Sequence, residues 1–152
     1  MAEFGAQTTS DEVLSGHDMN GQTFFITGCA SGLGQETARA MAARGAHVIL
    51  CARDAGKLEA AANEIRSLTG SDRIETILCD LASLESVRAC GDEANQRFSR
   101  IDLLINNAGV MVPMDLQNHG LSPEALTKEI DINLKGPIQM TDAFVHHLKT
   151  RK

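Results

Sequence analysis

The sequence TGCASGLG at positions 27–34 decides the fold of this 152-residue chain. A short apolar run, Thr23–Thr27, leads into it, and a segment with helical periodicity begins near Leu33. The stretch is therefore a turn from a strand into a helix. The first backbone N–H groups of a helix have no partners within the helix and lie at the positive end of its dipole. Such a turn favours a bound phosphate group.

Three glycines in this turn have separate predicted roles. Gly28 permits the tight turn, Gly32 lets the backbone come close to a pyrophosphate, and Gly34 lets the helix pack closely against the strand. The alternative is a structural loop that contains several glycines. The position of the loop between strand and helix favours a dinucleotide-binding role.

The rest of the chain alternates between short apolar runs and stretches with helical periodicity. This pattern is typical of α/β proteins, in which βαβ units form a parallel sheet with helices on both faces. Asp54 and Gly70 are placed to start and end one helix. Ser83 is placed to start another, and Gly45 to end the helix that begins near Leu33. The predicted strands are Thr23–Thr27, His47–Cys51, Ile74–Cys79 and Ile101–Ile105.

Composition and charge exclude several classes of protein. Hydrophobic residues make up 43% of the chain and charged residues 22%, as in ordinary globular domains. The net charge of -6 and the lack of a Lys/Arg stripe argue against a nucleic-acid partner. No apolar run approaches the roughly 20 residues of a membrane span. Residues 1–20 are polar and are interpreted as a leader before a dinucleotide-binding domain at 21–152, so we expect a cytoplasmic protein.

The cysteines and histidines show no metal-binding pattern in the sequence. There is no CxxC pair and no histidine at metal-ligand spacing, so we expect reduced thiols and no metal. His146 and His147 are neighbours that would not share a helix face, and we expect them to be solvated. The four cysteines are Cys29, Cys51, Cys79 and Cys90.

Two motifs carry a resemblance to a known family. The pattern TGxxxGxG at 27–34, followed by NNAG at 106–109, resembles the short-chain dehydrogenases/reductases (SDR), and the resemblance covers Gly21 to about Thr150. It implies the N-terminal portion of a Rossmann-type doubly wound parallel sheet, cut after about four strands in the order 3-2-1-4. It also implies that the dinucleotide contacts these residues: Gly28, Ser31, Gly32, Leu33, Gly34, Asp80, Leu81, Asn107, Ala108 and Gly109.

The end of the second predicted strand bears on which dinucleotide binds. In such folds an acidic residue about 20 positions after the glycines bonds the ribose 2′-OH of NAD, whereas an arginine accommodates the 2′-phosphate of NADP. The family pattern puts Ala52 at the acidic position, followed by Arg53, whose guanidinium can grip a phosphate with two parallel bonds. This favours NADP(H) over NAD(H). Alternatively, Arg53 is a surface charge paired with Asp54 or Glu59, and Ser31 lacks a positive charge found in some NADP-preferring members.

A break in the last helical stretch singles out Asn133. Pro137 cannot donate a hydrogen bond to the carbonyl of Asn133, four residues earlier, so this carbonyl loses its usual partner. In the family the equivalent Asn lies at a disturbed turn, and its main chain holds a water in a proton relay, which implies that Asn133 belongs to the active site. The alternative is a kink that only bends the helix. The stretch carries one predicted apolar stripe: Ile130, Leu134, Ile138, Val145 and Leu148.

The catalytic side chains of the family are missing from this sequence. The family uses a Tyr for proton transfer, a Lys that lowers the pKa of the Tyr, and a Ser that orients the carbonyl, but the chain contains no tyrosine. Unassisted proton transfer forfeits about 10²- to 10⁴-fold in rate. We therefore expect the NADP(H)-binding portion of an oxidoreductase for carbonyl or alcohol substrates, inactive by itself. The alternative is a non-catalytic dinucleotide-binding or interaction module, and an unpaired fourth strand would favour homo-oligomers or sheet-edge association.

Overall fold

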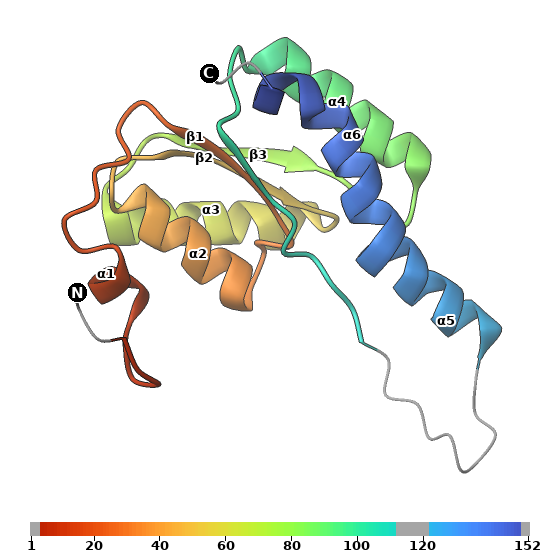
Figure 1. Cartoon of the computed structure of the whole chain (residues 1–152), viewed down its shortest axis with the longest axis horizontal. Helices are drawn as coiled ribbons and strands as arrows, with labels where there is room; N and C mark the ends of the chain where they lie inside the picture. Colours follow the sequence, from red (N-terminus) through yellow and green to blue (C-terminus); the bar gives the residue numbers. More distant parts are fainter. Residues whose placement is uncertain (1–3, 112–121, 150–152) are drawn as a thin grey trace.

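The structure is a computed structural model and describes residues 4–111 and 122–149 (Figure 1). The strands are β1 (Thr23–Thr27), β2 (His47–Ala52), β3 (Ile74–Leu78) and β4 (Leu103–Ile105). The α-helices are α1 (Ser10–Val13), α2 (Gly32–Ala42), α3 (Ala55–Thr69), α4 (Leu84–Arg97), α5 (Pro123–Ile130) and α6 (Gly136–Lys149). A π-helical segment, η1 (Asp131–Lys135), joins α5 to α6.

The four strands form one parallel sheet in the order β3-β2-β1-β4. In the middle of the sheet Ile26 lies between Leu50 on β2 and Ile105 on β4. Because all strands run in the same direction, their carboxyl ends meet at one edge, where α/β sheets bind their ligands. The structure confirms the predicted Rossmann-type α/β fold and the strand order.

Helices cover both faces of the sheet, with α2 and α3 on one face and α4 and α6 on the other (Figure 1). The strand residues alternate between two cores, as the period of a strand requires. Phe25 points toward α6, where its ring centroid lies 4.7 Å from that of Phe144. Phe24 and Ile26 belong to the core beneath α2 and α3. Every residue of β1 is buried, as expected for the central strand of a covered sheet.

The predicted element boundaries are close to those of the structure. Asp54 caps α3 by accepting a hydrogen bond from the Lys57 N–H at 2.9 Å, and Gly70 ends that helix in the left-handed region with φ of 67°. Ser83 caps α4 as predicted. Helix α2 ends at Ala42, before the predicted end, although Gly45 does adopt a positive φ of 88°.

The predicted apolar stripe of the last helical stretch is buried only in part, because Val145 and Leu148 are half-buried while its first three members are exposed. Ile130, Leu134 and Ile138 are 41%, 57% and 60% exposed, whereas the buried side chains are those of Ile132, Met140 and Phe144. The Gly136 N–H donates to the Asp131 carbonyl, five residues earlier, so the turn in η1 is wider than an α-helical turn. Ile130, Leu134 and Ile138 are nevertheless all exposed, on both sides of this turn and within it.

The N-terminal segment from residue 4 to 20 lies against α2. Arg39 is 3.0 Å from the carboxylate of Asp11, and Arg44 donates to the Asp11 carbonyl at 2.8 Å. The Met19 N–H donates to the Arg44 carbonyl at 2.9 Å. The division into a leader of residues 1–20 and a domain of 21–152 stays a prediction. Within the described residues, no helix combines the length and the apolar character that crossing a bilayer requires.

Candidate functional site

A cavity of about 500 Å³ lies at the carboxyl edge of the sheet, within the size range of ligand pockets. The turn after β1, the ends of β2 and β3, and the segment after β4 all contribute to its wall. It brings together all of the predicted dinucleotide contacts except Gly32: Gly28, Ser31, Leu33, Gly34, Arg53, Asp80, Leu81, Asn107, Ala108 and Gly109.

The glycines of the turn differ in what surrounds them. A Cβ atom on Gly28 would lie 2.6 Å from Cα of Ala108, and Gly28 has a φ of 68°. A Cβ atom on Gly34 would lie 2.5 Å from the Gly28 carbonyl oxygen, so only glycine allows α2 to come this close to the turn. Gly32 has a φ of 63°, but a Cβ atom there would meet nothing within 4 Å. The space beside Gly32 is open, although Gly32 is not among the residues that line the cavity.

The N-terminus of α2 has no side-chain cap. Ser31 is the N-cap residue, yet its side chain makes no capping hydrogen bond, and the first turn of α2 contains no acidic residue. By contrast, the N-cap side chains of Asp54 and Ser83 accept backbone hydrogen bonds at α3 and α4. Because Ser31, Leu33 and Gly34 line the cavity, the uncapped end of α2 borders it. This arrangement fits an anionic phosphate group.

Thr27 and Asn107 fix the turn to the end of β4. The Asn107 side-chain amide donates to the carbonyls of Thr27 and Gly28, each at 3.1 Å. The buried hydroxyl of Thr27 accepts hydrogen bonds from the Asn107 and Ala108 N–H groups, also at 3.1 Å. The two motifs that are far apart in the sequence therefore form one hydrogen-bonded unit. The sequence stretch contained Thr27, but its role in positioning the NNAG motif was not predicted.

Two cationic side chains, Arg53 and Lys57, line the cavity beyond the end of β2. Neither forms an ion pair with any residue in the described ranges. Glu59, one of the partners considered for Arg53, instead lies 3.2 Å from Arg66. Asp54, the other, accepts a hydrogen bond from the N–H of Lys57. Lys57 was missed by the sequence analysis, although its position three residues after a helix cap places it in the first turn of α3.

Asp80 and Leu81 follow β3 and also line the cavity. The Asp80 N–H donates to the Ser86 hydroxyl at 2.9 Å, and the Asp80 Oδ1 atom accepts from the Ala82 N–H at 3.0 Å. These bonds hold the exposed Asp80 carboxylate at the rim, while Leu81 is 8% exposed and packs into the core. The pair therefore offers one polar and one apolar contact side by side.

Asn133 lies in η1 and does not line the cavity, but it contacts Val110, which does. Its side-chain oxygen accepts from the Val110 N–H at 2.8 Å, and its side-chain nitrogen donates to the Val110 carbonyl at 2.6 Å. Val110 lines the cavity, whereas Asn133 does not. The side chain of Asn133 thus ties the segment after β4 to the π-helical turn. Its carbonyl has lost the usual α-helical donor because residue 137 is proline.

All four cysteines are free and buried, and two of them, Cys51 and Cys79, line the cavity. The Cys29 sulfur accepts from the Cys51 N–H at 3.0 Å, and burial raises the pKa of the Cys29 thiol to about 12. Interactions with the thiols of Cys51 and Cys90 lower the pKa of Cys79. Cys51, Cys79 and Cys90 are far apart in the sequence, and their proximity depends on how β2, β3 and α4 pack.

The two histidines near the end of α6 differ in their surroundings. His146 is exposed, as expected, whereas His147 is half-buried and its Nε2 atom lies 2.7 Å from the Asn95 side-chain oxygen. Burial and the neighbouring His146 lower the pKa of His147. Neither histidine lines the cavity. The contact of His147 with Asn95 contributes to the packing of α6 on α4.

The fold and the cavity define a nucleotide-binding α/β domain of the Rossmann type. Residues 22–152 match the family model described as short chain dehydrogenase. The chain therefore belongs to the short-chain dehydrogenase/reductase family, as the two sequence motifs indicated.

Several curated proteins are similar in sequence. Human retinol dehydrogenase 13 is 36% identical over 130 residues, which cover 85% of this chain and 38% of that protein. The chloroplastic short-chain dehydrogenase TIC 32 B of Brassica napus is 34% identical over 148 residues, or 97% of this chain and 45% of that protein. The chain thus spans less than half the length of these relatives.

Solved structures of the family have the same fold. L-sorbose reductase from Gluconobacter frateurii, solved with NADPH and L-sorbose, gives a TM-score of 0.79 at 26% identity, covering 88% of this chain and 50% of that one. A metagenomic short-chain oxidoreductase in complex with NADP gives 0.77 at 34% identity, covering 86% and 57%.

Proposed function

We propose that this chain binds NADP(H) in the cavity at the carboxyl edge of the sheet. It would form the nucleotide-binding portion of an oxidoreductase that transfers hydride between a nicotinamide cofactor and a carbonyl or alcohol substrate. The observation that carries the proposal is the pairing of an uncapped N-terminus of α2 with two cations, Arg53 and Lys57, that have no counter-ion among the described residues. Both features attract phosphate groups, and NADP(H) carries phosphates at two separated places.

The residues around the cavity would divide the dinucleotide among them. The backbone N–H groups at the uncapped N-terminus of α2, where Ser31, Leu33 and Gly34 line the cavity, would bind the pyrophosphate. Arg53 and Lys57 would bind the 2′-phosphate, because Ala52 supplies no carboxylate to compete for it. Asp80 and Leu81 would contact the adenine.

The activity of a complete enzyme would need residues beyond those of this sequence. The solved neighbours include proteins in complex with NADP(H), which supports this class of cofactor. Asn133 would contribute its main-chain carbonyl to proton transfer, while its side chain positions the segment after β4. A chain without tyrosine would bind the dinucleotide without reducing a carbonyl substrate at an enzymatic rate. A cytoplasmic location stays a prediction.

Calorimetric titration of the purified chain with NADP⁺ and NAD⁺ tests the proposal. We expect tighter binding of NADP⁺, and we expect Arg53→Ala or Lys57→Ala to weaken NADP⁺ binding by about 10- to 100-fold, the usual effect of losing a charged hydrogen bond. NAD⁺ binding should change little. Arg66→Ala is the matched control, because Arg66 lies on α3 and outside the cavity lining.

Two results would contradict the proposal. The absence of heat with both dinucleotides would argue against cofactor binding altogether. If the Arg53 and Lys57 variants lost equal affinity for NADP⁺ and for NAD⁺, the result would argue against a 2′-phosphate site.

A second candidate function is that of an interaction module, favoured by the exposure of β4. This strand is at the edge of the described sheet, and its Leu103 side chain is 41% exposed. An unpaired parallel edge can add a strand from a second copy or from another chain. Light scattering over a range of concentrations should then detect oligomers that Leu103→Lys weakens. A monomer at all concentrations would contradict self-association.

A further inference from the structure

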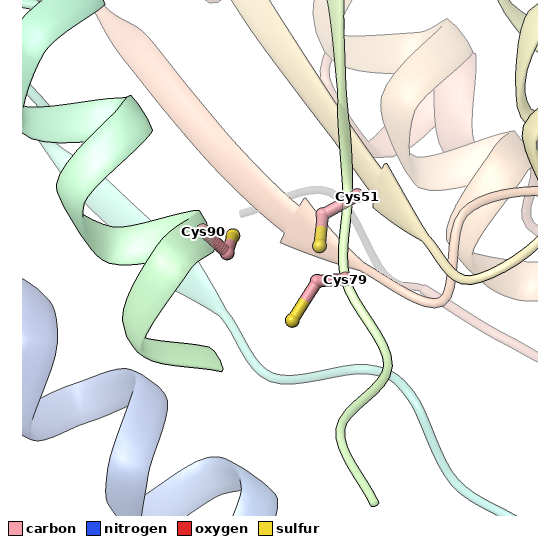
Figure 2. Close-up of side chains that lie close together, drawn as sticks. All are labelled: Cys51, Cys79 and Cys90. Carbon is pink, nitrogen blue, oxygen red and sulfur yellow. The ribbon is translucent and has the colours of Figure 1, made fainter. Parts of the chain in front are cut away.

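Three of the four cysteines form a buried cluster between the sheet and α4. Cys51 comes from β2, Cys79 from the residue after β3, and Cys90 from the middle of α4. Their sulfur atoms all lie within 4.8 Å of one another, and the side chains are 1%, 4% and 1% exposed. Figure 2 shows the three side chains gathered in the space between α4 and the carboxyl ends of the strands.

The backbone fixes the three cysteines independently of any bond between them. Cys51 is held in the parallel ladder opposite Thr27 and Ile77. The Cys79 N–H donates to the Ala52 carbonyl at 3.0 Å, and Cys90 lies within a capped helix of 14 residues. Because the elements hold their positions, the thiols are preorganised for a common ligand, which lowers the entropic cost of binding one.

The spacing of the sulfur atoms suits one metal ion. Three sulfurs bound about 2.3 Å from a single ion lie about 4 Å apart. Because no two sulfur atoms of the cluster are more than 4.8 Å apart, binding requires a contraction of less than about 1 Å, which rotamer adjustments of cysteine can supply.

We propose that Cys51, Cys79 and Cys90 bind a thiophilic metal ion, Cu(I), through their three sulfur atoms. Soft thiolate ligands select Cu(I) and zinc among the biological metals. Zinc sites almost always have four ligands, but no His, Asp or Glu of the described residues completes this group. A three-coordinate, all-sulfur site suits Cu(I) better. The inference does not depend on the function proposed above.

The cluster borders the cavity on one side. Cys51 and Cys79 also line the cavity at the carboxyl edge of the sheet, so a metal carried by a small thiol or chelator can approach from that side. The thiols must lose protons to bind, so the apparent affinity should fall as the pH is lowered.

The test is a competition for Cu(I) under anaerobic, reducing conditions between the full chain and the chromophoric chelator bicinchoninate. We expect the chain to withdraw one Cu(I) per molecule, and X-ray absorption to show three sulfur neighbours with no nitrogen or oxygen. Cys79→Ala and Cys90→Ala should each lower the affinity by more than about 100-fold, beyond the usual effect of changing a residue behind a ligand.

The control variant is Cys29→Ser, which removes the sulfur and keeps an acceptor for the Cys51 N–H. Cys29 is also fully buried, but its sulfur is not a member of the cluster, so this variant should still withdraw one Cu(I). Thermal unfolding of each variant shows whether it is folded, and the stoichiometry and X-ray absorption of the unmodified chain do not depend on any variant. The proposal is overturned if the unmodified chain withdraws no Cu(I), if the Cys79 and Cys90 variants retain the ion, or if a parallel titration shows equal or tighter binding of Zn(II).

Discussion

The side-chain amide of Asn107 donates a hydrogen bond of 3.1 Å to the carbonyl oxygen of Gly28 and so joins the segment after β4 to the turn after β1. The same amide donates to the Thr27 carbonyl. A side chain with two donors is required at this place, since both partners are acceptors. The relationship explains why the NNAG motif and the glycine turn occur together in one structure.

Replacing Asn107 by aspartate should therefore destabilise the fold. The carboxylate would face the two carbonyl oxygens without a proton to donate, and we expect a loss of about 1–3 kcal/mol in the free energy of unfolding. Urea denaturation measures this loss in the free energy of unfolding. Asn106→Asp is the control, because Asn106 makes one exposed hydrogen bond of 3.4 Å, to Thr141, and its change should stay within about 0.5 kcal/mol. If both variants lost the same free energy of unfolding, the result would contradict the role of Asn107.

Gly34→Ala tests the close approach of α2 to the turn. The added methyl group would meet the carbonyl oxygen of Gly28 at 2.5 Å, and the backbone there cannot move without disturbing β1. We expect a loss of about 1–3 kcal/mol, as for other overpacked sites. Gly56→Ala on α3 is the matched control. Its Cβ would meet nothing closer than 3.5 Å, so it should stabilise the protein by up to about 1 kcal/mol. A stable Gly34→Ala protein would show that the turn has room for a side chain.

The sequence predicted well those features that depend on local structure. The turn at residues 27–34 could be recognised because its glycines, strand and helix are adjacent in the chain, and the structure places it at the cavity. Asp54 and Gly70 were predicted as the ends of α3 because caps act within a few residues.

Features that depend on packing between distant segments were not predictable. Lys57 lines the cavity only because α3 leaves β2 in one particular direction. The contact between the thiols of Cys79 and Cys90 depends on how α4 lies on the sheet. The exposure of the apolar residues around Leu134 was not predictable, because the burial of Met140 and Phe144 instead depends on packing against segments that are distant in the sequence.

Ala52→Asp should reverse the dinucleotide preference. Ala52 is half-buried at the end of β2 and lines the cavity beside Arg53, so a carboxylate there would repel a 2′-phosphate and accept a hydrogen bond from a 2′-OH. We expect NADP⁺ binding to weaken by roughly tenfold or more, and NAD⁺ binding to strengthen, in calorimetric titrations. Ala55→Asp is the control, since it adds the same charge three residues later but outside the cavity lining. If Ala52→Asp changed the affinities for NADP⁺ and NAD⁺ in the same direction, the result would contradict the placing of residue 52 beside the 2′-phosphate.

The Glu36 carboxylate helps to attach the N-terminal segment, and lowering the pH should weaken this attachment. Hydrogen bonds from Arg39 and from the Ser10 hydroxyl lower the pKa of the Glu36 carboxyl to about 2 from its ordinary value of 4.5. A carboxyl whose pKa is lower in the folded than in the unfolded state stabilises the fold fully above pH 4.5, and this contribution is lost as the pH falls from 4.5 towards 2. Because the Glu36 side chain is 48% exposed, solvent screening keeps the contribution small.

The measurement is the free energy of unfolding of the unmodified chain and of Glu36→Gln between pH 7 and pH 2. The glutamine variant should be less stable at neutral pH, and its stability should fall less steeply below pH 4.5, because residue 36 no longer takes up a proton. Glu64→Gln removes the same charge from an exposed residue that bonds to Gln35 on α2 and leaves Ser10 and Arg39 unaffected. It should retain the steep acid dependence. If Glu36→Gln and the unmodified chain lose stability in parallel, the hydrogen bonds from Ser10 and Arg39 do not stabilise the N-terminal segment.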